Sequence, residues 1–586
     1  MRGGTIAIAL AATAAAAPSH ACELARIAEL PVTMEGLRPL VPVKINDLET
    51  KLILDTGAFF STVDASSAKR AGMKNTMPGF EVPTLGFGGS AILTAGRADT
   101  VMLADIPLKK VDFLIHQRPI SPFAAGLLGQ NVLRPFDVEY DLAHGAIRIF
   151  RPKGCAKANL AYWAAGQNLS VLPIRPTDIA QPHTRFSVQI NGVTVGAMLD
   201  SGVSSSTLDT SAAARAGVRA DSPGAKSYGI GSGIGRSLVE GWSAPFDKVK
   251  IGDEEIHNTR LTVAKFGDLN FQFLLGADFL LSHRVLVSTS QRQIYFTYNG
   301  GPVFHLPDPA VVATSARAAA PDPTAAPEAE IDAALLGRRA AASAARRDFP
   351  AAIRDYTAAL VARPDDPELL RGRALAYLAT KQKDPAARDL DRALKLDPGH
   401  VQSLLARGRV RLAQKDLAGA QADFEAALKG APHELYLPLS VADQYARADA
   451  AERAIALYDA WIAAHPKDNF IAQAFNGRCW ARTIWNRQLD LAAADCEAAL
   501  HKARPNSETL NSRGVLRLRL GQLDAAIADF DASLRLQPNL AWSLYGRGLA
   551  KTRKGPAGSG DADLKAAVAL DPDLTEEAAR YGLAPT

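Results

Sequence analysis

The sequence has few of the residues that mark metal sites and nucleic-acid-binding surfaces. It holds four cysteines and 11 histidines in 586 residues, and no two cysteines are spaced as Cys-x-x-Cys. Zinc sites need such ligands grouped along the chain, so no metal site is expected. The 66 basic and 61 acidic residues are scattered, without a Lys/Arg stripe interleaved with aromatics. The formal net charge of +5 therefore predicts no nucleic-acid partner.

Long apolar runs are also missing, and no segment reaches the roughly 20 residues that cross a bilayer. The run from Thr5 to Ala17 follows Met1-Arg2 and precedes Ser19-His20-Ala21. A short apolar run after a basic residue, closed by a small-x-Ala site, predicts a signal peptide over residues 1–21 and a periplasmic or secreted protein. Lipid anchoring at Cys22 is the alternative. Ser19 disfavours it, because lipobox sequences usually carry an aliphatic residue there.

Signals for several catalytic classes are absent as well. No nucleophile elbow supports a Ser-His-Asp or Cys-His site. Two glycine-rich runs, residues 85–90 and 228–235, lack the G-x-G-x-x-G spacing, and no helical pattern follows them. A dinucleotide site is therefore not expected, and the sequence indicates no cofactor.

One short element occurs twice in the N-terminal half. Residues 52–57 read LILDTG and residues 197–202 read AMLDSG. Counted from the acid of each copy, an Asp follows at 9 (64−55 and 209−200) and a Gly at 17 (72−55 and 217−200). An apolar-apolar-Gly triplet ends at Gly129 and Gly276. Matched features about 145 residues apart (200−55) indicate a duplicated domain.

Short β-branched and aromatic runs broken by turn residues surround both copies. Asn191-Gly192 predicts a two-residue β-hairpin, and Asn46-Asp47 holds the same place in the first copy. Each acid of the repeated element is thus expected in the loop after the second hairpin strand. Asp64 and Asp209 are expected to cap short helices, because Ala/Ser/Lys/Arg-rich sequence follows them.

The duplicated pattern resembles the aspartic proteases, in which each of two lobes donates one Asp from a D-T/S-G loop. The resemblance implies an all-β bilobal domain, with lobes over residues 28–152 and 168–300. The lobes are short, so they look more like retroviral-type protease domains joined in tandem. The catalytic pair would be Asp55 and Asp200. The supporting residues would be Thr56, Gly57, Ser201 and Gly202 around the pair, and Gly129 and Gly276 in the second signature loop of each lobe.

The glycine-rich runs hold the position of the family's flaps, β-hairpins that close over bound peptide. Glycine gives such a hairpin the freedom to move. The residues expected in the two flaps are Gly86, Phe87, Gly88 and Gly89 in lobe 1, and Tyr228, Gly229, Gly231 and Gly233 in lobe 2. Plain turns are the alternative.

Two adjoining carboxyls cannot both ionise readily, so one keeps a proton while the other is an anion. In aspartic proteases such a pair activates water to hydrolyse a peptide bond by general acid/base catalysis. The alternative is that Asp55 and Asp200 only cap turns. Pepsin-like relatives carry a hydroxyl residue after D-T-G, whereas Ala58 and Val203 stand here. The loss of that donor predicts raised pKa values and a weakly acidic optimum.

The C-terminal half has a different pattern. An Ala/Pro-rich stretch over residues 303–331 predicts a linker crossed by few contacts. Beyond it prolines recur with gaps of 34, 34, 34, 39, 33 and 34, at Pro364, Pro398, Pro432, Pro466, Pro505, Pro538 and Pro572. With Gly408 and Gly514 at the eighth position, this period resembles the tetratricopeptide repeat (TPR). The resemblance implies about seven helical repeats over residues 332–586, which form an all-α solenoid with a groove for a protein partner.

Export permits disulfides. Cys22 and Cys155 flank the first lobe, and a bridge between them would tie its ends. Cys479 and Cys496 fall on the two helices of the fifth repeat and would clamp them together. Unpaired thiols are the alternative for both pairs. Arg371, Arg373, Arg407 and Arg409 are expected on solvated helix faces.

The sequence therefore predicts a multidomain chain that is an exported aspartic endopeptidase, with peptide or protein substrates and a TPR docking domain. The alternative function is a non-catalytic peptide- or protein-binding module that keeps the protease-like groove on a TPR scaffold.

Overall fold

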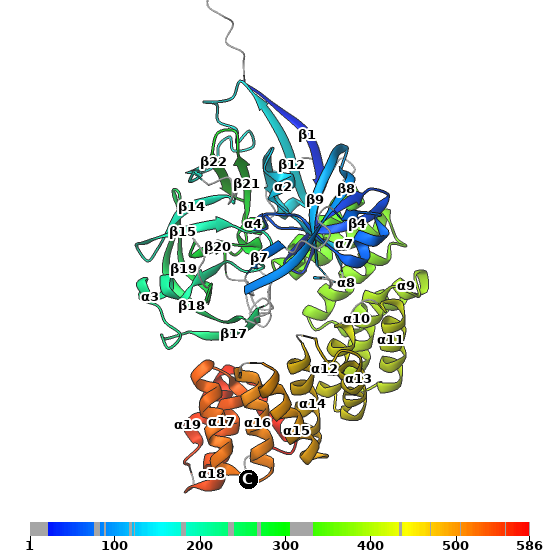
Figure 1. Ribbon diagram of the computed structural model, residues 1–586, viewed down its shortest axis with the longest axis vertical. Helices are drawn as coiled ribbons and strands as arrows, with labels where there is room; N and C mark the ends of the chain where they lie inside the picture. The colour runs from blue at the N-terminus through cyan, green and yellow to red at the C-terminus, as the bar shows by residue number, and fades with distance from the viewer. Residues whose placement is uncertain are drawn as a thin grey trace, which may run out of the picture.

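The computed structural model describes residues 22–584 apart from 76–81, 87–88, 117–119, 122, 177–182, 232–238, 267–270, 305–331, 433–435, 469, 504 and 557. The expected signal peptide and nearly all of the expected linker lie outside the described residues. Strands dominate from Glu23 to Tyr298, and helices follow from Ala333 onward (Figure 1). The predicted order, an all-β region with two lobes followed by an all-α region, is confirmed.

Lobe 1 is a nine-stranded sheet in the order β2-β3-β4-β10-β5-β9-β8-β6, with β7 paired to β8. The short strand β10 lies parallel to β4 and antiparallel to β5, and therefore holds two separate loops in register. The strands are β2 (Thr33–Glu35), β3 (Arg38–Ile45), β4 (Leu48–Leu54), β5 (Thr62–Asp64), β6 (Lys74–Asn75), β7 (Val82–Gly86), β8 (Gly89–Leu103), β9 (Ile106–His116) and β10 (Gly126–Leu128).

Lobe 2 repeats this plan in a seven-stranded sheet of order β14-β15-β20-β16-β19-β18-β17. The predicted hairpin is present: Asn191 and Gly192 join β14 to β15 with φ of 46° and 82°, the left-handed values that a tight hairpin turn needs. The strands are β14 (Arg185–Ile190), β15 (Val193–Leu199), β16 (Thr207–Asp209), β17 (Lys226–Gly231), β18 (Val239–Ile251), β19 (Glu254–Ala264) and β20 (Phe273–Leu275).

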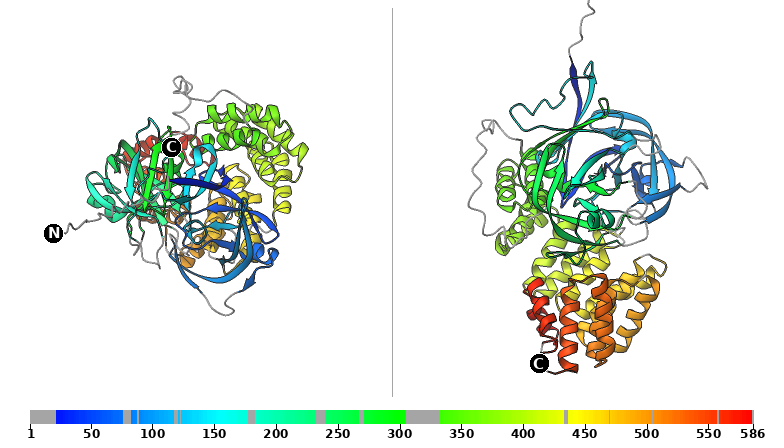
Figure 2. Two further views of the ribbon diagram at one scale, coloured as in Figure 1. Left: turned by 90° about the horizontal axis from the view of Figure 1, so that it is seen from above. Right: turned by 90° about the vertical axis from the view of Figure 1, so that its left-hand side faces the viewer.

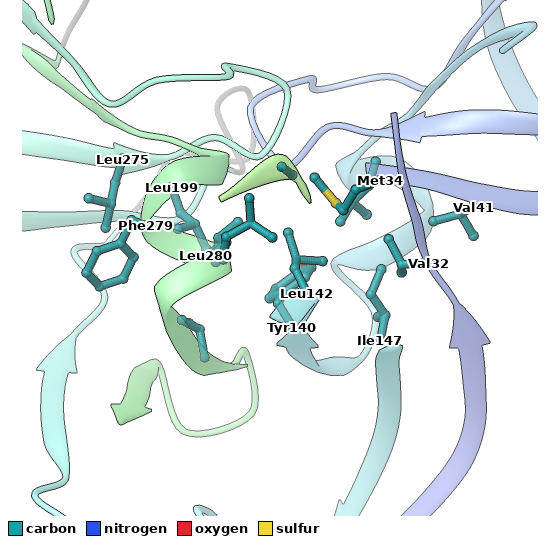
Figure 3. Packing of buried hydrophobic residues seen from close by; sticks show 14 of the residues in the cluster. Val32, Met34, Val41, Tyr140, Leu142, Ile147, Leu199, Leu275, Phe279 and Leu280 are labelled. Carbon is teal, nitrogen blue, oxygen red and sulfur yellow. The ribbon is translucent and has the colours of Figure 1, made fainter. Parts of the chain in front are cut away.

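A third, six-stranded sheet joins the lobes, in the order β1-β12-β11-β21-β22-β13. Its central pairing is between β11 of lobe 1 and β21 of lobe 2, where Val138 lies opposite Val287. The strands are β1 (Glu23–Pro31), β11 (Asp137–Asp141), β12 (Ala146–Lys153), β13 (Ser170–Pro173), β21 (His283–Ser288) and β22 (Gln293–Tyr298). Figure 3 shows buried side chains of both lobes, such as Met34 and Leu280, meeting in one core.

Short helices close the loops of each lobe. The Asp64 carboxylate accepts a hydrogen bond from the backbone N–H of Ser67 at the start of α1 (Ala65–Arg70). Asp209 does the same for Ser211 at the start of α3 (Thr210–Arg215). Both predicted helix caps are confirmed. The remaining helices of the lobes are α2 (Gln130–Leu133), the 3₁₀ helix η1 (Leu142–His144) and α4 (Ala277–Ser282).

The C-terminal region consists of antiparallel helix pairs with a final single helix. Glycine at the eighth position of a repeat lets a ring pack on the helix: a Cβ on Gly408 would overlap Phe424, and one on Gly514 would overlap Phe530. The helices are α6 (Ala333–Ala345), α7 (Phe349–Ala362), α8 (Pro367–Ala379), α9 (Lys383–Leu396), α10 (Val401–Ala413), α11 (Leu417–Gly430), α12 (Leu437–Arg447), α13 (Ala451–Ala464), α14 (Ile471–Trp485), α15 (Leu489–Lys502), α16 (Ser507–Arg519), α17 (Leu523–Leu536), α18 (Ala541–Lys554), α19 (Asp561–Leu570) and α20 (Leu574–Arg580).

Both expected disulfides are present. Cys22–Cys155 links the start of β1 to the residues after β12, and so joins the two ends of lobe 1. Cys479–Cys496 links α14 to α15 within one helix pair. Bonds of this kind form and persist in oxidising compartments, which fits a location outside the cytosol.

The expectation that the repeat-region arginines lie on solvated faces is wrong for three of the four. Arg373 and Arg407 each bind the Asp 16 residues further on, Asp389 and Asp423, through both Nε and Nη2. Arg371 is buried and binds Glu35 of lobe 1 with Nη–Oε distances of 3.1 and 2.9 Å. The 16-residue spacing places the Arg and Asp on facing helices of one pair, which a reading of single helix faces misses.

The expectation of few contacts across the linker is also wrong. Helix α6 packs against β2 and η1 of lobe 1, and its Leu336, Ala340 and Ala341 belong to the same buried cluster as the lobes. The repeats then curve away below the lobes (Figure 2) and return beneath β17 of lobe 2 (Figure 1), where Asn539 donates a hydrogen bond to the carbonyl of Ala225. Linker composition does not reveal that an apolar helix face follows it.

Candidate active site

The two repeated elements meet at the junction of the lobes. Asp55 follows β4 and its backbone N–H donates to the carbonyl of Leu128 in β10 at 3.0 Å. Asp200 follows β15 and its N–H donates to Leu275 in β20 at 2.9 Å. Each acid is thus held by the second signature strand of its own lobe. The structure brings the two acids, 145 residues apart (200−55), close enough for the charge of Asp55 to raise the pKa of Asp200.

The hydroxyl residues after the acids bind across the lobe boundary in a reciprocal network. Thr56 Oγ1 donates to the carbonyl of Leu199 at 3.0 Å and accepts from the N–H of Ser201 at 2.9 Å. Ser201 Oγ donates to the carbonyl of Leu54 at 2.9 Å and accepts from the N–H of Thr56 at 3.1 Å. Both side chains are buried, so the four bonds fix the separation and orientation of the two loops.

The glycines of the two loops each face the opposite acid. A Cβ added to Gly57 would overlap the Asp200 carboxyl group, and one added to Gly202 would overlap the Asp55 carboxyl group. Only glycine therefore permits this approach of backbone to carboxylate. Within its own loop, Asp55 Oδ1 accepts from the N–H groups of Gly57 at 3.0 Å and Ala58 at 2.8 Å. Asp200 Oδ1 accepts from Gly202 N–H at 3.0 Å.

Burial and the charge of the neighbouring acid shift the pKa values of Asp55 and Asp200 by different amounts. Burial raises the pKa of Asp200 well above its usual range, and the negative charge of Asp55 raises it further. Burial also raises the pKa of Asp55, but the N–H of Ala58 and a hydrogen bond from Asp200 oppose that rise. The pair therefore keeps one proton after the first ionisation, and the larger rise at Asp200 favours that acid as its holder.

A second layer of residues supports the signature loops, and sequence analysis did not assign it. Ser61 Oγ accepts from the N–H of Gly129 at 3.0 Å and donates to Asn131 at 2.8 Å. In lobe 2, Ser206 Oγ accepts from Gly276 N–H at 2.8 Å and donates to Asp278 at 2.6 Å. The repeat spacing could have identified the two serines, because each stands six residues after its acid (61−55 and 206−200). These bonds place Gly129 and Gly276 directly beneath the dyad loops.

The comparisons with known proteins agree with this geometry. The aspartyl protease family model matches twice, over residues 41–132 and 186–279. The tetratricopeptide repeat model matches residues 338–401, 382–434 and 486–541. The chain joins an aspartyl protease domain to tetratricopeptide repeats. No curated protein matches the chain.

Similar solved structures divide between the two parts. The aspartic proteinase from Irpex lacteus has 14% sequence identity and covers 47% of this chain and 97% of its own, with a TM-score of 0.32. A tetratricopeptide repeat protein from Parabacteroides merdae has 20% identity and covers 38% of this chain and 86% of its own, also with a TM-score of 0.32. Each of these structures covers less than half of this chain.

The expected flaps of the aspartyl protease domain fall on β-hairpins in both lobes. In lobe 1, Gly86 and Gly89 pair across β7 and β8, while Phe87 and Gly88 lie outside the described residues. In lobe 2, Tyr228, Gly229 and Gly231 lie in β17, which pairs with β18, and Gly233 lies outside the described residues. The hairpins hold the predicted places, and their closure over peptide stays a prediction.

Two further findings concern only the described part of the chain. No group of three or more His, Cys, Asp or Glu side chains is placed to hold a metal ion there. Within those same residues, no helix combines the length and apolar character needed to pass through a membrane.

Proposed function

We propose that the protein is an exported aspartic endopeptidase whose dyad is Asp55 and Asp200. The observation that carries the proposal is the contact of the two acid-bearing loops, held by four reciprocal hydrogen bonds between Thr56 and Ser201 and their loops. A turn-capping role alone would need neither the contact nor a glycine facing each opposite acid.

The larger rise in the pKa of Asp200 supports a division of roles between the two acids. Asp55, as the anion, takes a proton from a water molecule between the carboxyls while the water oxygen attacks the peptide carbonyl carbon. Protonated Asp200 gives its proton to the carbonyl oxygen, which produces a neutral tetrahedral diol. Asp55 then gives the proton it took from water to the amide nitrogen as the C–N bond breaks, while Asp200 takes a proton from one diol hydroxyl. The products are an amine and a carboxylic acid, and the dyad again holds one proton on Asp200. No covalent enzyme intermediate is needed in this sequence.

The repeats supply protein recognition in this proposal. TPR solenoids bind protein segments on an extended curved surface. Here the C-terminal repeats lie beneath the β17 hairpin, so a polypeptide bound along them would be held near the lobes (Figure 1). The two disulfides favour a periplasmic or secreted location, and the predicted signal peptide would direct the chain there.

Incubation of the purified protein with a diverse peptide pool, from about pH 4 to about pH 8, tests the proposal. Wild type should cleave internal peptide bonds, with the highest rate in the weakly acidic range. Asp55→Asn and Asp200→Asn should each lower the rate by roughly 10²- to 10⁴-fold, because each removes one acid/base partner. Asp99→Asn, which alters an exposed ion pair with Lys74, is the matched control. If all four proteins leave the pool intact, the protein is a binding module.

A further inference from the structure

A polar cavity of about 270 Å³ lies where the first repeat docks on the aspartyl protease domain. Its lining comes from three places: η1 and the residue after β22 in the lobes, and helices α6 and α7 of the repeat. At the roughly 30 Å³ that one water occupies in the liquid, the cavity has room for about nine waters. It includes no residue of the dyad loops, so the proposed catalytic chemistry does not explain it.

The cavity walls carry more positive than negative charge. Arg339 is neutralised by Asp355, with N–O distances of 2.5 and 2.7 Å. His144 is paired with Asp141 at 2.7 Å. Arg346 and Arg354 remain, and neither forms an ion pair with any of the described residues. Two guanidinium groups without an ion-pair partner thus border one space.

Arg346 is the more informative of the two. It is half-buried, and its described hydrogen bond runs from Nη1 to the carbonyl of Leu281 at 3.3 Å, which leaves most of its donors without a partner among the described residues. Burial lowers the pKa of the guanidinium group, because the charges of Asp348 and Asp355 compensate the lost hydration only in part. Removing part of a charged group from water has a free-energy cost, which a ligand or water that accepts from the remaining donors would offset.

Hydroxyl and amide groups complete the wall. Ser343 is 3% exposed, lines the cavity, and its hydroxyl has no hydrogen-bond partner among the described residues. Asn299 borders the same space, and its side-chain amide donates to Asp141 at 3.5 Å. Guanidinium, hydroxyl and amide groups together are the donors that proteins use to bind phosphate and carboxylate.

We propose that this cavity is an oxyanion-binding site formed by Arg346, Ser343 and Arg354. The ligand is a phosphate or a carboxylate whose oxygens accept from Arg346 and Ser343, with Arg354 at the surface adding charge. Because the lining comes from both the lobes and the first repeat, bound anion stabilises their docking. The site does not depend on peptide hydrolysis by the dyad.

Isothermal titration calorimetry of the full-length protein with inorganic phosphate, and separately with acetate, tests the site at constant ionic strength set by chloride. We expect saturable binding of at least one of them. The stronger ligand identifies the anion as phosphate-like or carboxylate-like. Arg346→Gln should weaken binding at least tenfold, the equivalent of about 1.4 kcal/mol. Ser343→Ala and Arg354→Gln should each weaken it by about threefold.

Arg392→Gln is the matched control, because Arg392 is an exposed, ion-paired arginine on another helix pair. Binding by this variant should equal that of wild type. Arg354 lies on the surface, so its variant tests the site even if Arg346→Gln does not fold. The proposal is overturned if neither anion binds saturably, or if Arg392→Gln loses as much affinity as Arg354→Gln.

Discussion

The two lobes support their dyad loops with different side chains. In both, a serine six residues after the acid holds the N–H of the signature glycine, but the serine donates to the neutral amide of Asn131 in lobe 1 and to the buried acid Asp278 in lobe 2. Gln130 of lobe 1 also donates to the carbonyl of Thr56 at 2.8 Å, whereas Ala277 stands after Gly276 in lobe 2. The bonds that Thr56 and Ser201 form across the lobe boundary are matched one for one.

The difference between the supporting layers, beside the matched bonds of Thr56 and Ser201, indicates which part of the site has a constrained geometry. Each dyad loop bonds to the other lobe's loop, so a change in one displaces both. The layer beneath only has to hold a serine, and its hydroxyl donates to an amide oxygen in lobe 1 and to a carboxylate oxygen in lobe 2. The lobes differ again at their outer faces, because β2 and η1 of lobe 1 carry helix α6. Lobe 1 therefore has the closer packing against helix α6, while Arg346 and Asn539 each donate one hydrogen bond to lobe 2.

The largest expected effect comes from removing that helix. A chain that ends at Phe304 loses the buried side chain of Leu336, several buried alanines and the Arg371–Glu35 ion pair. Burial of each large apolar side chain contributes roughly 1.5–3 kcal/mol, so the truncation should destabilise the lobes by several kcal/mol. Hydrogen exchange should rise in β2 and η1 far more than in the β14–β15 hairpin of lobe 2.

A chain that ends at Ala464 is the control, since it keeps α6 to α13 and should protect lobe 1 as the full chain does. Equal protection of lobe 1 with and without α6 would show that the linker separates two independent domains.

The buried acid of lobe 2 gives the next largest effect. Burial raises the pKa of Asp278 from 3.8 to about 6, because its effect outweighs that of the hydrogen bonds from Ser206 and Phe279, which lower the pKa. A raised folded-state pKa contributes stability that is fully present below the unfolded value of 3.8, and this stability is lost as pH rises through about 6. Because the pKa rises by roughly two, the free energy of unfolding should fall by about 3 kcal/mol over this range.

Asp278→Asn gives lobe 2 the residue type of lobe 1 and removes this titration. Urea unfolding at about pH 4 and about pH 7.5 should show a smaller difference between the two pH values in the variant than in wild type. Asn131→Asp should do the reverse and make lobe 1 less stable at the higher pH. An unchanged pH dependence in both variants would mean that Asp278 does not titrate in this range.

The smallest effect concerns the residues after the dyad glycines. Ala58→Ser adds a hydroxyl donor beside Asp55, lowers the pKa of that acid, and should move the acid limb of the activity profile down by roughly half to one pH unit. Val203→Thr adds a donor beside Asp200, lowers the pKa of that acid, and should instead move the alkaline limb of the profile down. If either substitution shifts the limb assigned to the other lobe, the assignment of the proton to Asp200 is wrong.

Much of this arrangement could be predicted from the sequence, because the duplication places matched residues at matched offsets. The hairpin turn at Asn191-Gly192, the caps at Asp64 and Asp209, and both disulfides depend on local chemistry or on alignment of repeats. The docking of α6 could not be predicted, since an apolar helix face does not indicate which surface it will cover. Nor could the pairing of Arg371 with Glu35, two residues 336 positions apart.

The central claim is that the two lobes of one chain form a single acid–base pair. Hydrolysis of one cleavable peptide by Asp55→Asn, by Asp200→Asn and by their equimolar mixture tests it most directly, with wild type as the reference. If each chain builds its own dyad, wild type cleaves and the mixture is no more active than its two components. Recovery of activity in the mixture would show that the dyad forms between chains and would contradict the claim.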